Sequence, residues 1–378
     1  MNRSAITRRT LLGNLAKGGA AFATVSISAR ALGLAASQAP GRIVIGTVPV
    51  NAVLASYLGA EFFRSEGLDI EVSRHQAGPQ VLQGLATGDI AVGDLGLAPI
   101  VIALTRGLPV IAPHLSCFST PDRPFERIIV PADSPIRTLN DLKGKKLGYQ
   151  GAGTVPDLLL GALPRKSDIR KEDIELVPIP PPNQPAALAQ GLVDAIFATP
   201  PVDAAAERQF KARTLVDATA LVPYAGLAGL VVRRDFAEDH PDAVKRLFKA
   251  AIRLARWIRD NEGPARSVAA RTLNLPQDLA VQSRLPVFAR NGLAVMPNVW
   301  HVYEMLAAAR TIERHPNPEQ LFERTIVEPA HKFVAPALDE VGIVRDQAAE
   351  MMLRAEYPLL PGPVTNYHSD WERRLLQT

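Results

Sequence analysis

The chain carries the stretch Leu85-Ala86-Thr87-Gly88-Asp89-Ile90-Ala91-Val92 and repeats its pattern as Leu188-Ala189-Gln190-Gly191-Leu192-Val193-Asp194-Ala195-Ile196-Phe197. In each version an apolar helical segment ends near a glycine, and an aspartate then leads into an apolar run. The pattern predicts a helix closed by glycine and a short strand that the aspartate begins. Two such units indicate two similar α/β halves, whose strand ends can face each other across a ligand.

Strands and helices alternate along most of the chain. Apolar, β-branched runs predict strands at 42–48, 68–72, 89–92, 109–112, 128–130, 147–149, 174–177, 193–198 and 227–232. Helical spacing of apolar residues predicts helices at 53–63, 80–86, 99–104, 186–190 and 241–259. This alternation is typical of a largely parallel sheet, and a proline-rich, charged bend at 119–124 separates the two halves.

The N-terminal segment predicts export. Residues 1–39 contain five basic residues and no acidic residue, and Arg8-Arg9 precede Leu11-Leu12 and an uncharged run at 18–29. That run is shorter than the ~20 apolar residues that span a bilayer. We expect residues 1–36 to be a cleaved export signal that resembles the twin-arginine type, and the protein to be periplasmic. The segment has no cysteine for lipid attachment, so we do not expect a lipoprotein. The alternative is a disordered or helical N-terminal arm.

Charge and cysteine content exclude several classes. The chain has 42 Lys+Arg and 38 Asp+Glu, a net charge of +4, and loss of the five basic residues of the signal leaves 37 against 38, or −1. Such a near-neutral protein offers no basic footprint, and we expect no nucleic-acid partner. Cys117 is the only cysteine, so no intrachain disulfide can form, and we interpret it as a buried apolar residue.

Six short motifs occur in order along the chain. They are Ala77-Gly78-Pro79-Gln80, Gly88-Asp89-Ile90 through Val92-Gly93-Asp94, Arg106-Gly107-Leu108-Pro109-Val110, Leu139-Asn140-Asp141-Leu142-Lys143-Gly144-Lys145-Lys146, Gly191 to Asp194, and Phe236-Ala237-Glu238-Asp239-His240-Pro241. Together they resemble the periplasmic substrate-binding proteins of ABC importers for aliphatic sulfonates, nitrate and taurine, a family that also includes thiamine-pyrimidine binders. The resemblance covers roughly residues 42–275.

The resemblance implies an α/β, two-lobe type II periplasmic-binding-protein fold. Each lobe would be a mixed, largely parallel sheet flanked by helices, with two hinge crossings between the lobes. Lobe one would comprise 41–120 plus 222–378, and lobe two 121–221. A monomer of this kind would close on a small-molecule ligand without a cofactor and deliver it to a membrane permease and its ATPase. A signalling receptor is the alternative partner, because both partners would recognise the closed form.

Candidate ligand-binding residues follow from the rule that ligands meet the carboxyl ends of strands and the amino ends of helices. They are Thr47, Val48, Pro49, Asn51, His75, Gln76, Gly78, Asp94, Leu95, Gly153, Thr154, Val155, Thr199 and Pro200. Asn51 and Asp94 also suit helix caps, and His75 also suits a plain surface position. We interpret the glycine-rich loop at 150–156 as an anion cradle, with Thr154 as hydroxyl donor and helix cap.

The ligand class rests on what these loops lack. They hold no arginine cluster, although Arg74, Arg123 or Arg127 can still reach the site. A buried charge without paired donors costs several kcal/mol, which favours a weakly hydrated sulfonate or an uncharged heterocycle over phosphate. We therefore expect a small organic anion, namely an aliphatic sulfonate, a taurine-like or a nitrate-like ligand. A pyrimidine or an aromatic carboxylate is the alternative.

Motifs of common enzymes do not occur in the sequence. It contains no Gly-x-Ser-x-Gly elbow, no Gly-Lys-Ser/Thr phosphate loop, no His-Glu-x-x-His pair and no cysteine pair for zinc, so we assign no catalytic and no metal-binding residue. The enzymatic alternative is a desulfinase of the same fold. Sulfinate desulfinases use a cysteine in the loop after the first strand, where this chain has Thr47-Val48-Pro49. A binding protein without enzymatic activity is therefore the expectation.

Overall fold

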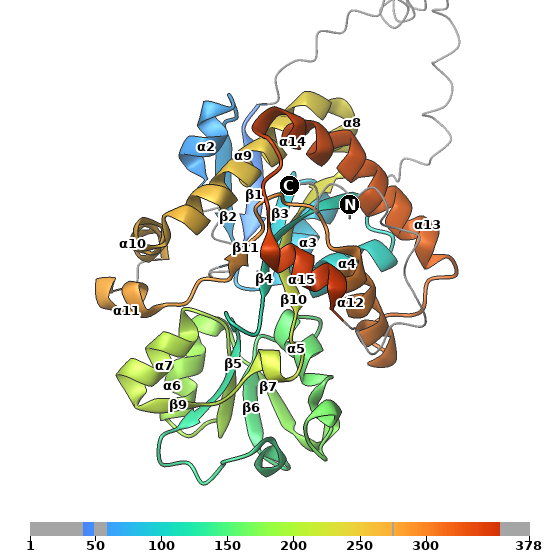
Figure 1. The fold of residues 1–378 in the computed structure, drawn as a ribbon. Coiled ribbons are helices and arrows are strands. Elements are labelled where there is room, and N and C mark those ends of the chain that lie inside the picture. Colours follow the sequence, from blue (N-terminus) through green and yellow to red (C-terminus); the bar gives the residue numbers. More distant parts are fainter. Residues whose placement is uncertain (1–40, 49–58, 274–275, 356–378) are drawn as a thin grey trace, which may run out of the picture. The chain divides into compact units, whose positions relative to one another are not determined.

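The structure is a computed structural model that describes residues 41–48, 59–273 and 276–355. In these ranges the chain forms two β-sheets flanked by helices (Figure 1). The export signal expected at 1–36, the first part of the helix expected at 53–63, and the candidate residues Pro49 and Asn51 lie outside the described residues.

The first sheet has six strands in the order β11-β4-β10-β3-β1-β2. These strands are β1 (Ile43–Thr47), β2 (Ile70–Arg74), β3 (Val92–Gly96), β4 (Val110–Ser119), β10 (Ala225–Arg233) and β11 (Val287–Phe288). β1 pairs in parallel with β2 and β3, whereas β10 pairs antiparallel with β3 and β4. Strands β1 to β4 therefore run in one direction and end at the same edge of a mixed sheet.

The second sheet has five strands in the order β7-β6-β8-β5-β9. They are β5 (Arg127–Pro131), β6 (Lys146–Tyr149), β7 (Glu175–Pro178), β8 (Ala195–Ala198) and β9 (Ala212–Asp217). β6 is parallel to β7 and β8, and β5 is antiparallel to β8 and β9. The expectation of two mixed sheets is thus confirmed. The sequence did not predict β9, because all its residues are half-buried and show no alternation.

Two segments, 120–126 and 218–224, connect the sheets, and we call them the two crossings. Ser119 pairs with Ala225 in the first sheet and Arg127 pairs with Asp217 in the second, so both crossings begin and end at paired positions. The backbone N–H of Ala218 donates to the carbonyl of Glu126 at 2.9 Å, which joins one crossing to the other. In Figure 1 both connections run between the sheets.

The repeated helix-glycine-strand pattern is present twice. Helix α3 (Gly78–Thr87) ends at Gly88 with φ 91°, and α6 (Gln184–Ala189) is followed by Gly191 with φ 68°. The left-handed region suits glycine because no Cβ clashes there. The aspartate leads directly into the strand only in the second copy, where Asp194 precedes β8. In the first copy the prediction is wrong, because Asp89 accepts a hydrogen bond from the Thr87 hydroxyl at 2.7 Å and β3 begins only at Val92.

The remaining helices surround the two sheets. They are α2 (Ala60–Ser65), α4 (Leu97–Thr105), α5 (Val155–Leu160), α7 (Val202–Phe210), α8 (Arg234–Asp239), α9 (Pro241–Asp260), α10 (Glu262–Leu273), α11 (Gln277–Gln282), α12 (Met296–Ala308), α13 (Pro318–Phe322), α14 (Ala335–Val341) and α15 (Gln347–Arg354). Two π-helical segments, 323–327 and 330–334, lie between α13 and α14. Among the helices in the described ranges, none combines the length and apolar character needed to cross a membrane.

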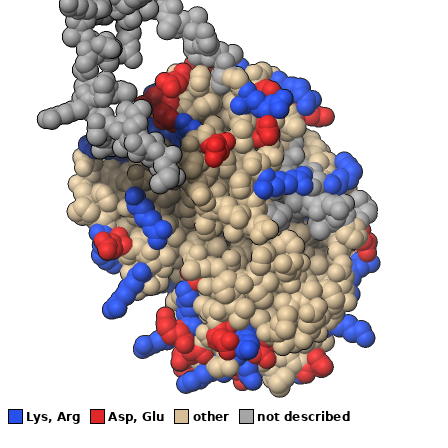
Figure 2. All heavy atoms as spheres, turned by 180° about the vertical axis from the view of Figure 1, so that it is seen from behind, with Lys and Arg blue, Asp and Glu red and all other residues tan. Residues whose placement is uncertain are grey.

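Charges on the surface are mixed in sign. On the face drawn in Figure 2, basic and acidic side chains are interspersed rather than gathered into a basic patch. On α9, Lys249 pairs with Glu66 at 3.1 Å and with Glu340 at 2.8 Å, and Arg253 pairs with Glu66 at 2.6 Å. The basic face of this helix therefore serves ion pairs with α14 and with the residue that follows α2.

Candidate ligand site at the junction of the two sheets

The first sheet carries two buried polar side chains on neighbouring parallel strands. Thr47 is the last residue of β1, whereas Asp94 is the middle residue of β3, so the loop expected at 93–96 is wrong; both residues are fully buried. The Thr47 carbonyl accepts a hydrogen bond from the His75 backbone at 2.8 Å, but its hydroxyl has no hydrogen-bond partner among the described residues. Asp94 does not cap the following helix, since the residue before α4 is Gly96 and makes no side-chain cap.

The second sheet contributes the loop after β6 and the start of α5. Thr154 precedes α5, but its hydroxyl donates to the Gly151 carbonyl at 2.7 Å instead of capping the helix. The Gly153 N–H donates to the Asp157 carboxylate at 2.9 Å. The predicted cap at Thr154 is therefore wrong, because the loop satisfies its own polar groups. Gly153 has φ 74°, the left-handed conformation that such a tight loop requires.

The two sides approach each other closely beside these residues. A Cβ built on Gly96, at the end of β3, would lie 3.1 Å from Val155 Cγ2, at the start of α5. A Cβ on Gly153 would lie 3.0 Å from Ile102 Cδ1 of α4. An added Cβ at either position would push the opposing side chain away by a few tenths of an ångström, so the two glycines let the two sides pack closely. We call this region, with the adjoining crossing at Glu126, the sheet junction.

A chain of hydrogen bonds runs through the sheet junction. Gln150 Nε2 donates to Thr199 Oγ1 at 2.8 Å, and Thr199 Oγ1 donates to Glu126 Oε1 at 3.2 Å. Glu126 is only 3% exposed, and its second oxygen, Oε2, has no hydrogen-bond partner in the described part of the chain. Burial raises the pKa of the Glu126 carboxyl to about 8, against the opposing effects of Thr199 and the Arg284 guanidinium.

The thiol of Cys117, in β4, is influenced by the charges of both buried acids, Asp94 and Glu126. Burial raises the pKa of the thiol far above the usual range, and the nearby Asp94 and Glu126 carboxyls add to that effect. The thiol is fully buried and stays protonated at neutral pH, so it is not an activated nucleophile. The interpretation of Cys117 as a buried residue is confirmed.

Other predicted residues take different places. His75 and Gln76, with Arg74 and Gln80, line a pocket of about 480 Å³ beside α3, where Ser73 Oγ lies 2.9 Å from the His75 ring. The buried candidates among the rest are Leu95, Val155 and Pro200, while Val48 and Gly78 are half-buried. Leu95 points into the core of the first sheet rather than toward the sheet junction, since its side chain lies beside Gly78 and Gly93.

Sequence reasoning missed Glu126 as a site residue, and it included Gln150 only as part of the glycine-rich loop at 150–156. Glu126 lies two residues after the proline-rich, charged bend at 119–124, where acids usually face solvent. The available signal was its place directly before a buried strand, between Phe125 and Arg127. Gln150 follows β6 directly, as the predicted residue Thr199 follows β8, so both lie where the rule that strand ends carry the site places ligand contacts.

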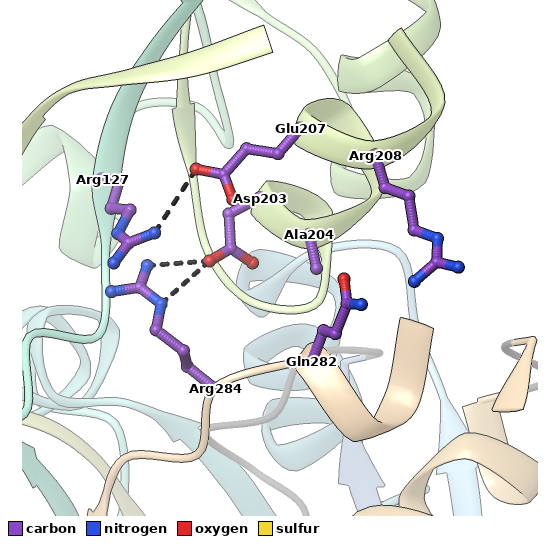
Figure 3. A pocket seen from close by; sticks show the side chains of 7 residues that line it. All are labelled: Arg127, Asp203, Ala204, Glu207, Arg208, Gln282 and Arg284. Carbon is purple, nitrogen blue, oxygen red and sulfur yellow. Dashed lines mark hydrogen bonds and ion pairs between the residues drawn. The ribbon is translucent and has the colours of Figure 1, made fainter. Parts of the chain in front are cut away.

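A second pocket, of about 330 Å³, lies beside the crossings (Figure 3). Arg284 donates two hydrogen bonds to Asp203 of α7, at 3.0 and 2.8 Å, and Arg127 donates to Asp217 at 2.7 Å. Arg123 pairs with Glu262 at 2.5 Å. Arg123 and Arg127 are thus paired with carboxylates of this chain. No group of three or more His, Cys, Asp or Glu in the described ranges is placed to hold a metal ion.

Comparisons of sequence and of structure find similar proteins among periplasmic binding proteins. The taurine-binding periplasmic protein of Escherichia coli (strain K12) is 28% identical over 191 residues, which are 50% of this chain and 58% of that protein. The matched region thus spans less than two thirds of this relative. Among solved structures, the periplasmic aliphatic sulphonate binding protein SsuA from Escherichia coli aligns with a TM-score of 0.60 at 24% identity, over 73% of this chain and 90% of that one.

These solved structures, all below 25% identity, show likeness of fold alone. The periplasmic nitrate-binding protein NrtA from Synechocystis PCC 6803 aligns with a TM-score of 0.69 at 12% identity, over 83% of this chain and 98% of that one. The desulfurization enzyme DszB aligns with a TM-score of 0.58 at 18% identity, over 80% and 100%. The model of the NMT1/THI5-like family matches residues 51–262, more than half of the sequence. The chain therefore belongs to the NMT1/THI5-like family.

Proposed function

We propose that this chain is the periplasmic solute-binding component of an ABC-type importer and that it captures a small organic anion by closure of two lobes. The fold and the family support the proposal, as does the taurine-binding relative. We take lobe one as 41–120 plus 222–378 and lobe two as 121–221, so that each lobe holds one sheet. Residues 1–36 would be the twin-arginine-type signal that directs export, and the exported chain would be a monomer.

The sheet junction carries this proposal. The Thr47 hydroxyl comes from the first sheet and the Glu126 carboxyl from the crossing beside the second, and each has a buried oxygen without a hydrogen-bond partner in the described residues. A buried polar group left unpaired costs about 1–3 kcal/mol, so such atoms at a junction of two lobes are best explained by a ligand that pairs with them. Asp94, Thr154, Val155, Thr199 and Pro200 would complete the binding surface.

The charges near the junction favour a weakly hydrated oxyanion. Arg123 and Arg127 are paired with Glu262 and Asp217, so they do not serve as free guanidinium clamps for a phosphate. Hydroxyl and amide donors suffice for a sulfonate or nitrate, whose charge is spread over three oxygens. We propose an aliphatic sulfonate, taurine-like or nitrate-like ligand, which a permease and its ATPase would then carry inward.

A desulfinase activity is the competing function of the same fold. The loop after β1 begins with Thr47-Val48 and offers no thiol there, while Cys117 lies fully inside β4. A protonated thiol without solvent access does not attack a sulfinate. Sulfite released steadily from an aromatic sulfinate by the purified protein would nevertheless overturn the assignment as a binding protein.

A thermal-shift screen tests the proposed ligand class. The panel contains alkanesulfonates, taurine, nitrate, aromatic carboxylates and pyrimidines, with sulfate and phosphate as controls. A ligand at 100 times its Kd adds about 2.7 kcal/mol to the free energy of unfolding, which is readily visible as a higher Tm. We expect a sulfonate or nitrate to give the largest shift. A shift from pyrimidines alone would overturn the ligand class, and neighbouring genes for a permease and an ATPase would separate import from signalling.

A further inference from the structure

Glu126 is a buried carboxyl that the fold does not fully use. It lies in the first crossing, directly before β5, and its side chain is buried. One oxygen accepts from Thr199, whereas Oε2 has no partner among the described residues. The Arg284 guanidinium, which lowers the pKa of Glu126, donates hydrogen bonds to Asp203 and to the Pro124 carbonyl. In the part of the chain that the structure describes, no ion pair involves Glu126.

The direction of the hydrogen bonds decides which oxygen carries a proton. Gln150 Nε2 donates to Thr199 Oγ1, and the Thr199 hydroxyl donates its own hydrogen to Glu126 Oε1. Because Oε1 accepts in this arrangement, we place the proton of the neutral carboxyl on Oε2. The neutral form then presents an O–H donor at the sheet junction, and the described residues offer Oε2 no hydrogen-bond partner.

The surroundings favour the neutral form. Burial holds the pKa of Glu126 at about 8, even though the Arg284 guanidinium lowers it. The Glu126 carboxyl and the Asp94 carboxyl of β3 both raise the pKa of the Cys117 thiol in β4. Beside the crossing the Arg127 guanidinium is paired with Asp217 and Glu207. The carboxyl therefore meets one paired cation, a neutral thiol and a second acid nearby.

We propose that Glu126 is a specificity residue that donates a hydrogen bond from Oε2 to an oxygen of the bound anion. The inference rests on the proposed function, since it requires an anionic ligand at the sheet junction. A sulfonate or nitrate oxygen supplies the acceptor that Oε2–H lacks, whereas a ligand with an ammonium group at this position would require the carboxylate form. Glu126 would thus select ligands that present oxygen, and not a cation, to the crossing.

Titration of binding against pH tests this role. The probes are ethanesulfonate and nitrate, which have no amino group and stay ionised across the range, and taurine as the amine-bearing comparison. Since only the protonated form donates, the Kd of wild type for the amine-free anion should weaken about tenfold from pH 7 to pH 9. Isothermal titration calorimetry on the exported protein measures both the Kd and the protons taken up.

Two substitutions of Glu126 distinguish a role as hydrogen-bond donor from a role as charged carboxylate. Glu126→Gln keeps an acceptor for Thr199 and an N–H donor toward the ligand, so it should bind the anion at least tenfold more tightly than Glu126→Leu and without the pH dependence. Glu207→Gln, which removes a carboxylate of α7 near the same crossing, is the matched control and should keep the wild-type pH slope.

The outcomes separate the two levels of the proposal. If no anion of the panel binds wild type, the proposed function fails and this inference fails with it. If an amine-free anion binds but its Kd is flat or tightens with rising pH, only the role of Glu126 is overturned. The same holds if Glu126→Gln loses taurine while it retains ethanesulfonate, because that result shows a carboxylate that binds ammonium. The wild-type pH titration stands by itself should a variant fail to fold.

Discussion

Replacing Arg284 with methionine would remove the ion pairs that join α7 to the segment after α11. Arg284 donates from Nε and Nη2 to Asp203 Oδ2 (Figure 3). Its Nη1 donates to the Pro124 carbonyl at 2.5 Å. Its Nη1 also lies 3.5 Å from Asp217. Asp203, whose side chain is 3% exposed, would then be a buried carboxylate without its cation.

The cost follows from that burial. Removing one partner of a buried ion pair costs about 3–5 kcal/mol, and we expect about 3 kcal/mol because the Arg284 side chain is 21% exposed. Burial already raises the pKa of Asp203, and Arg284 opposes this shift. Without the guanidinium the folded-state pKa rises further. The extra instability should therefore be full at neutral pH and shrink as the pH falls through that raised pKa, where the folded carboxyl becomes neutral.

Urea unfolding, followed by circular dichroism at neutral and acidic pH, measures this loss. Adding Asp203→Asn to Arg284→Met removes the stranded charge, so the double variant should be more stable than Arg284→Met alone at neutral pH. Arg208→Met is the matched control, because its ion pair with Asp278 is largely exposed and should be worth less than about 1 kcal/mol. A loss below about 1 kcal/mol for Arg284→Met would refute the reasoning. So would a double variant whose loss of stability equals the sum of the losses of Arg284→Met and Asp203→Asn alone.

Two further predictions concern stability. Glu126→Gln should raise the free energy of unfolding at pH 8 but not at pH 5. The wild-type carboxyl has a pKa of about 8 in the folded protein and about 4.3 in the unfolded chain, so the stability that its neutral form contributes is lost as the pH rises between these values. Parallel curves of Tm against pH for variant and wild type would contradict this. Gly46→Ala should cost about 1–3 kcal/mol in urea unfolding, since the added Cβ would lie 2.5 Å from Ile90 Cδ1 and 2.9 Å from Val81 Cγ1. Gly263→Ala, with nothing within 4 Å, is its control and should cost nothing.

Local signals in the sequence were sufficient for most elements of the fold. Glycines that end helices act through backbone conformation alone, so Gly88 and Gly191 marked both copies of the repeated unit. The length of β4 was underestimated, because His114 and Ser116 interrupt its apolar run although all its ten residues are buried. Polar residues within a central strand depend on the neighbouring strands for burial, and a single sequence does not show those neighbours.

The candidate site was harder to predict than the fold. Thr47 and Thr199 were correctly expected to lie at strand ends, where the rule for open α/β sheets applies without knowledge of packing, whereas Asp94, expected in a loop after the strand, lies in the middle of β3. Whether they bind a ligand stays a prediction. Glu126 was missed because an acid next to a charged bend is usually solvated, whereas in the folded chain its side chain is buried.

Arg284 and Glu126, the two ionisable side chains beside the first crossing, differ in how completely their polar atoms are paired, and we expect them to have different roles. Arg284 lies outside the region matched by the family model, yet it binds the carbonyl of Pro124, two residues before Glu126. It thereby fixes the crossing at the point where the carboxyl enters the sheet junction, and it lowers the pKa of Glu126 without forming a direct ion pair with it. A fully paired guanidinium thus holds the backbone, while the incompletely paired carboxyl beside it is left for the ligand. Any change at Arg284 should then alter anion binding as well as stability, through the position and protonation of Glu126.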